Sequence, residues 1–227
     1  GNDARAYPIK ILNYHEVVND RVGGVPLAVT FCPLTQSVLV FLRSVAGQEV
    51  TFGVSGCLYK SNVLMYDHQT DSLWSQLRKQ AVTGPMAGRR LETIAAMPMS
   101  WGHWKKRFPA SQVLSDQTGF DRDYQIDPYA GYDRIWFPVG DVRRDLSPKT
   151  RVLGIESGTH TKAYPLEKIV TERGTVRDRM GGREIEITVS AEGDVTAVVA
   201  SDGSPLVHVF VFWFAWQAFH PETEVYP

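Results

Sequence analysis

An internal repeat constrains the fold of this chain more than any other feature of its sequence. The segment Ala-Tyr-Pro-Ile at 6–9 recurs as Ala-Tyr-Pro-Leu at 163–166. The segment Asp-Arg-Val-Gly-Gly at 20–24 recurs as Asp-Arg-Met-Gly-Gly at 178–182. A strand-like run follows each Gly-Gly pair. Because the matches occur in the same order, the chain is predicted to contain two copies of one ancestral unit.

The second copy is predicted to be the shorter one. A third match pairs Trp-x-x-Trp at 101–104 with Trp-x-x-Trp at 213–216. The first two matches lie 157 or 158 residues apart and this one 112, so the second copy lacks about 46 residues, which correspond roughly to 53–96. We therefore predict a larger first unit over 1–115 that carries the functional site, a long connection over 116–150, and a shortened second unit over 151–227.

The residue pattern predicts a mostly β fold of the α+β class, in which two unequal repeats of strands and short helices pack into one body. Pro8 suits the first turn of a helix over 9–17, where its missing N–H costs little, and the Gly-Gly pair at 23–24 supplies a turn. The tryptophan motifs are typical of two further short helices. Strands are predicted at 25–32, 37–43, 49–54, 63–66, 151–156, 183–190, 194–200 and 206–212.

Charge and hydrophobicity narrow the range of partners. The 227 residues include 24 basic and 25 acidic side chains with no long run of either sign, so nucleic-acid binding has no electrostatic basis. No run of about 18 apolar residues is present, and a transmembrane segment is not expected. Hydrophobic residues make up 43% of the chain, enough for a core that needs no disulfide or metal. Cys32 and Cys57 leave the formation of one disulfide open.

Cys32 and His15 are the first candidates for functional residues. Cys32 ends a predicted strand and precedes Pro33, where a loop can expose a sulfur that acts as a nucleophile or a soft metal ligand. Imidazole binds metals, transfers protons and activates thiols. The alternatives are a buried apolar cysteine and a structural histidine. The second repeat has Ser190 and Thr171 near these positions, which favours functional roles in the first.

Polar and aromatic side chains in the segment that the second copy lacks suggest a ligand pocket. The candidates are Ser61, Tyr66, Asp67 and Trp74; the alternative for Ser61, Tyr66 and Asp67 is that they cap turns. His220 follows the second tryptophan motif and is a candidate third metal ligand if the chain folds back toward the first repeat. The motifs Gly-x-Ser-x-Gly, His-Glu-x-x-His and Cys-x-x-Cys are absent, which removes the commonest serine-hydrolase, zinc-protease and dithiol assignments.

Several of these motifs together resemble a known family. The segments Ala-Tyr-Pro-Ile, Asn-Tyr-His-Glu-Val-Val-Asn-Asp, Phe-Cys-Pro-Leu-Thr, Gly-Val-Ser-Gly-x-Leu-Tyr and Trp-Phe-Ala-Trp-Gln-Ala-Phe-His-Pro are similar to a bacterial and archaeal family known as domain of unknown function 3179. The resemblance covers essentially the whole chain and implies no particular activity. Gln36 stands where related sequences have glycine, and Lys60 where they have asparagine. Family members often carry an export leader, so the resemblance implies an extracytoplasmic (periplasmic or exported) protein.

The residues favour a metal-binding protein or metalloenzyme. Cys32, His15 and His220 would be the ligands of copper or zinc, since both metals bind thiolate together with imidazole. The first alternative is a metal-free thiol enzyme, with Cys32 as nucleophile and His15 as base. The second is a noncatalytic module that binds a small molecule between Tyr66, Trp74 and the long connection. Whether the protein is an enzyme, and its oligomeric state, are left open by the sequence.

Overall fold

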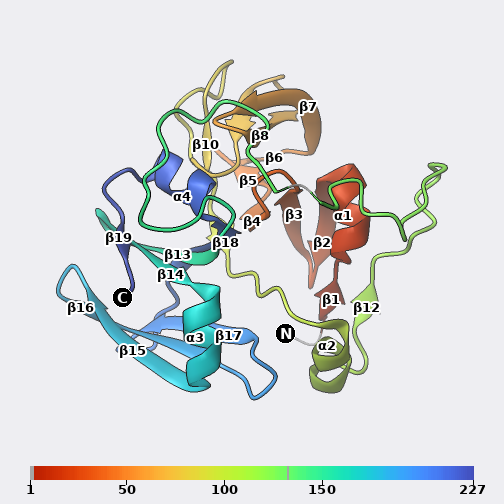
Figure 1. Ribbon diagram of the computed structural model, residues 1–227. Helices are drawn as coiled ribbons and strands as arrows, with labels where there is room; N and C mark the ends of the chain where they lie inside the picture. The colour runs from red at the N-terminus through yellow and green to blue at the C-terminus, as the bar shows by residue number, and fades with distance from the viewer. Residues whose placement is uncertain (1–2, 132) are drawn as a thin grey trace.

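The computed structural model describes residues 3–131 and 133–227 and confirms a mostly β fold with short helices (Figure 1). The first repeat contains β1 (Arg5–Ala6), α1 (Ile9–His15), β2 (Val17–Val22), β3 (Val25–Cys32), β4 (Ser37–Leu42), α2 (Trp101–Arg107) and β12 (Gln112–Val113). Between β4 and α2 it holds β5 (Ser44–Val45), β6 (Gln48–Glu49), β7 (Phe52–Tyr59), β8 (Asn62–Asp67), β9 (Leu73–Ser75), β10 (Gln80–Ala81) and β11 (Thr93–Ile94).

The second repeat follows the long connection. Its elements are β13 (Arg151–Ser157), β14 (His160–Pro165), α3 (Leu166–Glu172), β15 (Gly174–Met180), β16 (Arg183–Val189), β17 (Val195–Ala200), β18 (Val207–Phe212), α4 (Trp213–Phe219) and β19 (Glu224–Val225). In the described parts of the chain, no helix is both long enough and apolar enough to cross a membrane.

Local sequence sets both ends of α1. Pro8 precedes the first helical residue with a φ of −62°, as its ring requires. The helix ends earlier than the predicted range 9–17, because Glu16 adopts a φ of 55° and a ψ of −33° and the chain continues directly into β2. A positive φ is uncommon for a residue with a Cβ. The corresponding helix α3 also ends at a residue with positive φ, Arg173.

Strand pairing is the same at the edge of each repeat. β1 pairs in parallel with β12, with Arg5 opposite Gln112. β14 pairs in parallel with β19, with Lys162 opposite Glu224. In each case the paired segments flank the same series of elements, a helix followed by a β-hairpin.

Matched side-chain contacts support the repeat as well. The Tyr7 hydroxyl donates to Asp20 Oδ2 at 2.7 Å, and the Tyr164 hydroxyl donates to Asp178 Oδ2 at 2.9 Å. A basic residue two positions before each tyrosine forms an ion pair with the same aspartate. The sequence repeat is therefore also a structural repeat. The exact domain boundaries, 1–115, 116–150 and 151–227, stay a prediction.

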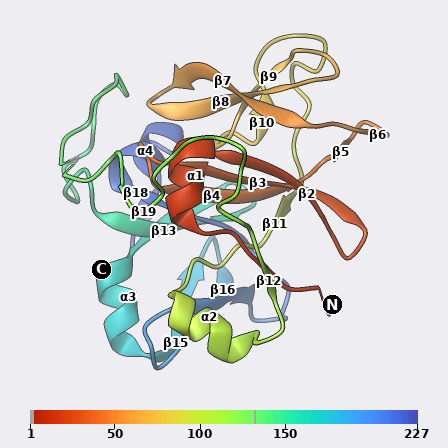
Figure 2. The same cartoon turned by 90° about the vertical axis from the view of Figure 1, so that its right-hand side faces the viewer.

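One sheet runs through both repeats, with the strand order β19-β14-β13-β18-β4-β3-β2 and with β11 also paired to β4. β18 and β4 meet at the register pair Phe210 and Val38, which joins the second repeat to the first. The insertion forms a separate sheet, β10-β9-β8-β7, and the second repeat another, β15-β16-β17. Figures 1 and 2 show these two sheets at opposite ends of the molecule.

The largest core cluster takes side chains from both repeats, including Phe41 and Trp74 from the first and Trp213 and Trp216 from the second. Gly154 in β13 lies directly against this cluster. A Cβ at Gly154 would come within 2.3 Å of Cε3 of Trp216, and Trp216 is fully buried. The close approach of strand and indole therefore requires glycine at this position.

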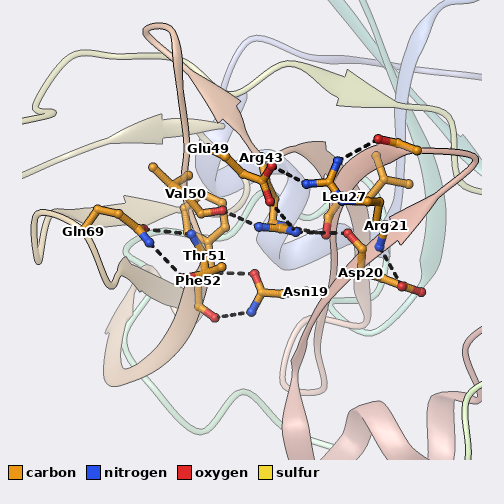
Figure 3. Close-up of polar contacts among 11 residues, drawn as sticks. Asn19, Asp20, Arg21, Leu27, Arg43, Glu49, Val50, Thr51, Phe52 and Gln69 are labelled. Atoms are coloured by element: carbon orange, nitrogen blue, oxygen red, sulfur yellow. Dashed lines mark hydrogen bonds and ion pairs between the residues drawn. The ribbon is translucent and has the colours of Figure 1, made fainter.

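Arg43 joins the shared sheet to the insertion (Figure 3). Its nearly buried guanidinium donates to three backbone carbonyls, those of Leu27 at 2.9 Å, Val50 at 2.7 Å and Asp20 at 3.2 Å. It also forms an ion pair of 3.2 Å with Glu49. Since these groups come from β2, β3 and the segment that leads into β7, one side chain fixes the position of the insertion.

Candidate ligand pocket

A pocket of about 240 Å³ lies between the end of α1, the β7–β8 hairpin and the long connection. Its walls are mostly apolar. Glu16 is the one charged side chain among the described residues that line it. Its lining residues include Glu16, Leu34, Cys57, Tyr129, Trp136 and Phe137.

The long connection supplies the aromatic wall of this pocket. Figure 1 shows the green segment passing from β12 along α1 and on toward α4. The Tyr14 hydroxyl lies within hydrogen-bond distance of the carbonyls of Asp123 at 3.2 Å and Ile126 at 3.0 Å, and the Ser61 hydroxyl donates to the carbonyl of Phe137 at 3.0 Å. These bonds help to place Tyr129, Trp136 and Phe137 in the pocket wall, and long connections of this kind are often functional.

Glu16 is placed in the pocket by the backbone that ends α1. Its N–H donates to the carbonyl of Leu12 at 2.9 Å, and its own carbonyl accepts from the N–H of Phe31 at 2.7 Å. Burial raises the pKa of the Glu16 carboxyl from 4.5 to about 7, because a low-dielectric environment disfavours the charged form. Positive φ and a shifted pKa in one residue are both frequent at functional sites.

Cys32 lies behind the pocket rather than in it. Its side chain is fully buried, and burial together with the nearby Glu16 charge raises its pKa, although hydrogen bonding to Thr35 opposes the rise. The neutral thiol is therefore favoured, whereas a nucleophile or metal ligand must be a thiolate. Cys57, in contrast, is exposed at the pocket. Both cysteines are free, so the disulfide that the sequence left open does not form.

A buried polar network fixes the turn that follows Cys32. The Asn62 amide nitrogen, with two N–H donors, lies within hydrogen-bond distance of Thr35 Oγ1 at 3.1 Å, Ser37 Oγ at 3.0 Å and Gln76 Oε1 at 2.9 Å. The Gln76 amide donates in turn to Thr30 Oγ1 at 2.8 Å. All five residues are almost completely buried. Satisfied networks of this kind specify a single arrangement, and this one positions Leu34 in the pocket wall.

His15 points to the long connection and not to Cys32. Its Nε2 lies 2.5 Å from the hydroxyl of Tyr124, which also contacts Thr118 Oγ1 at 2.6 Å. Burial, with a smaller contribution from Arg122, lowers the pKa of His15. Within the described residues no hydrogen bond joins His15 to the Cys32 thiol. The predicted close approach of these two side chains is therefore not supported by any contact.

His220 lies in a different cluster, between the insertion and the second repeat. Its ring packs on Trp216 with centroids 4.0 Å apart, and its Nε2 lies 3.7 Å from Glu156, which also pairs with Lys79. Burial lowers the pKa of His220 to about 4. Residues 3–131 and 133–227 hold no group of three His, Cys, Asp or Glu side chains placed to share a metal ion. The metal site formed by His15, Cys32 and His220 stays a prediction.

None of the four predicted ligand-pocket residues lines this pocket. Asp67 and Trp74 are fully buried, and the indole N–H of Trp74 donates to Asp67 Oδ2 at 2.8 Å. Tyr66 packs against the ring of His68. Only Ser61 contacts the pocket wall, through the carbonyl of Phe137. Asp67 and Trp74 therefore contact each other inside the insertion, outside this pocket.

Sequence reasoning missed Glu16, Cys57 and the aromatic side chains at 129, 136 and 137. In the His15-Glu16 pair the sequence indicates a role for the histidine alone. The sequence holds one indication of Glu16. Helix α1 is followed closely by strand β2 with no glycine between them, and such a junction needs an unusual backbone conformation at one residue.

Fold and pocket together define a mostly β protein of two unequal repeats, with a small aromatic-walled pocket where the long connection crosses the first repeat. Residues 1–205 match the model of the family described as protein of unknown function (DUF3179). The chain belongs to this family, as the motifs predicted. No match was found among curated proteins or among solved structures.

Proposed function

We propose that this protein binds a small organic cation, such as a substituted ammonium, in the Glu16 pocket. The observation that carries the proposal is a half-buried carboxyl group with a pKa raised to about 7, opposite an aromatic wall. A carboxylate in an apolar pocket is unfavourable without a partner of opposite charge. A ligand cation would provide that partner.

The aromatic residues favour a cation over other ligands. Faces of tryptophan, tyrosine and phenylalanine attract ammonium groups, most strongly where water is excluded. Tyr129, Trp136 and Phe137 line the pocket together with Glu16. The apolar side chain of Leu34 and the thiol of Cys57 suit the methyl or methylene groups of such a ligand. A volume of about 240 Å³ limits the ligand to a small molecule.

This proposal develops the small-ligand alternative drawn from the sequence, with different residues. A copper or zinc site and a Cys32–His15 thiol enzyme stay predictions. Cys32 is fully buried and burial raises its pKa, which supports neither role. Whether chemistry accompanies ligand binding is open, although a carboxyl with a pKa near 7 is suited to proton transfer.

Binding of choline is expected to strengthen as the pH rises. Because only ionised Glu16 pairs with the cation, the affinity should increase about tenfold between about pH 6 and pH 8, most of it below pH 7, and level off above pH 8. Titration calorimetry with choline and its uncharged carbon isostere tests this. Glu16→Gln should weaken choline binding at least about tenfold and remove its pH dependence. Binding of both compounds with equal affinity, independent of pH, would contradict the proposal.

Glu16→Gln is also expected to change how stability depends on pH. The folded state holds the Glu16 proton more tightly than the unfolded state, because the pKa is raised from 4.5 to about 7. The contribution of this group to stability is therefore lost as the pH rises from about 4.5 to about 7, by at most about 3 kcal/mol. Urea unfolding across this range should show the loss in the wild type and in the exposed control Glu167→Gln. An equal loss in Glu16→Gln would assign it to other groups.

A further inference from the structure

A large apolar groove lies beside β1. It has a volume of about 1080 Å³ and is bounded by β1, α1, the inner strands of the shared sheet, residues 94–99 and α2. Tyr7, Leu12, Ile94 and Trp104 are among its lining residues. An apolar groove of this size has room for a segment of polypeptide, and exposed apolar patches often mark interaction sites.

The second repeat shows what occupies the corresponding place. There β14 has a neighbour on each side, β19 in parallel and β13 antiparallel. β1 pairs with β12 in the same way that β14 pairs with β19, but among the described residues no strand lies on its other side. The position that corresponds to β13 is therefore the groove.

The residues around β13 in the second repeat correspond to residues that line the groove in the first. In the second repeat, Leu153 and Ile155 of β13 pack in one core with Tyr164 and Ile169. The counterparts of Tyr164 and Ile169 in the first repeat are Tyr7 and Leu12, which line the groove. In the first repeat the corresponding side chains therefore face a groove instead of a strand, although Leu12 itself is buried by its own core.

The tryptophans of the two repeated Trp-x-x-Trp motifs also occupy corresponding positions. On the opposite face of β13, Gly154 packs against the indole of Trp216, with no room for a Cβ. Trp104 is the counterpart of Trp216, and the two indole N–H groups donate to equivalent residues, to Ser111 Oγ at 2.7 Å and to Thr223 Oγ1 at 2.9 Å. Trp104 lies in the groove wall, where a glycine of an added strand would face it.

We propose that this groove is a strand-binding site. Its occupant is an extended polypeptide strand that runs antiparallel to β1, with the residue pattern of β13: apolar side chains toward α1 and a glycine toward Trp104. Strand addition at a free sheet edge gains affinity from main-chain hydrogen bonds and selectivity from the alternating side chains. The inference is independent of the function proposed for the Glu16 pocket.

A labelled peptide tests the inference directly. A peptide with the sequence Arg151–Ser157 should bind the protein saturably in fluorescence anisotropy. Its variant with valine in place of the glycine should bind at least about tenfold more weakly, because the added side chain meets Trp104. In the protein, Ile94→Glu should weaken binding to a similar extent, since a charge is introduced into the apolar groove. Val207→Glu is the matched control, because Val207 has similar exposure and lies outside the groove, and it should leave binding unchanged.

Three results would overturn the proposal. One is the absence of peptide binding to protein that is folded by circular dichroism. Another is equal binding of the glycine and valine peptides. A third is a dimer in sedimentation velocity that Ile94→Glu dissociates, since the groove would then be covered by a second copy of the chain.

Discussion

Arg43→Met is expected to lower the free energy of unfolding by roughly 3–5 kcal/mol. The substitution keeps much of the volume of the side chain but removes the donors to the carbonyls of Leu27, Val50 and Asp20. Each buried carbonyl that loses its partner costs about 1–3 kcal/mol. Urea unfolding, followed by circular dichroism, measures the change.

Two further variants separate geometry from charge. Arg43→Lys keeps the positive charge, but a single ammonium cannot replace a planar guanidinium that donates in several directions, so most of the loss should remain. Arg21→Met removes an exposed arginine that pairs with the same residue, Glu49, and should change stability by less than about 1 kcal/mol. A loss of stability for Arg43→Met as small as that for Arg21→Met would show that the carbonyl contacts are unimportant.

Gly154→Ala is expected to cost roughly 3 kcal/mol, although it adds only a methyl group. Its Cβ would come within 2.3 Å of the Trp216 ring. β13 cannot move away readily, because it is paired with β14 on one side and β18 on the other. The indole cannot move readily either, since it is fully buried and donates to Thr223 Oγ1 at 2.9 Å.

Gly102→Ala is the matched control for this substitution. Gly102 lies in α2, and a Cβ added there meets no atom within 4 Å. Alanine should raise stability at this position by up to about 0.5 kcal/mol, because glycine is less favourable than alanine in a helix and Gly102 lies in the first turn. Thermal or urea unfolding of the two alanine variants should therefore give changes of opposite sign. A neutral Gly154→Ala would mean that the strand and the indole are less tightly packed than the structure shows.

The repeat could be predicted from the sequence because its matched residues make matched contacts. Tyr7 and Asp20 lie in the repeated motifs and bond to each other, as do Tyr164 and Asp178. The β-rich fold was also predictable. Short runs of apolar and β-branched residues that are bounded by turn-forming glycines are typical of β-strands. Those features depend on neighbours that are close in the chain.

The pocket was not predictable in the same way. Its aromatic wall comes from residues that follow Glu16 by more than a hundred positions, in a connection without helical or strand periodicity. His15 was expected near Cys32 but bonds to Tyr124 in that connection. The conformation of Glu16 depends on tertiary contacts such as that with Phe31, and local propensity gives no indication of a positive φ at glutamate.

The main core contains side chains from both sides of the long connection, so the fold does not depend on an unbroken chain there. Phe41 and Trp74 precede the connection and Trp213 follows it, yet all three pack in one cluster, and β4 pairs with β18 across the same division. Noncovalent contacts therefore hold the two parts together. Near Phe120, which is 65% exposed, the covalent link mainly sets the effective concentration at which one part meets the other. A break there would turn a unimolecular folding reaction into a bimolecular one, with a stability that depends on protein concentration.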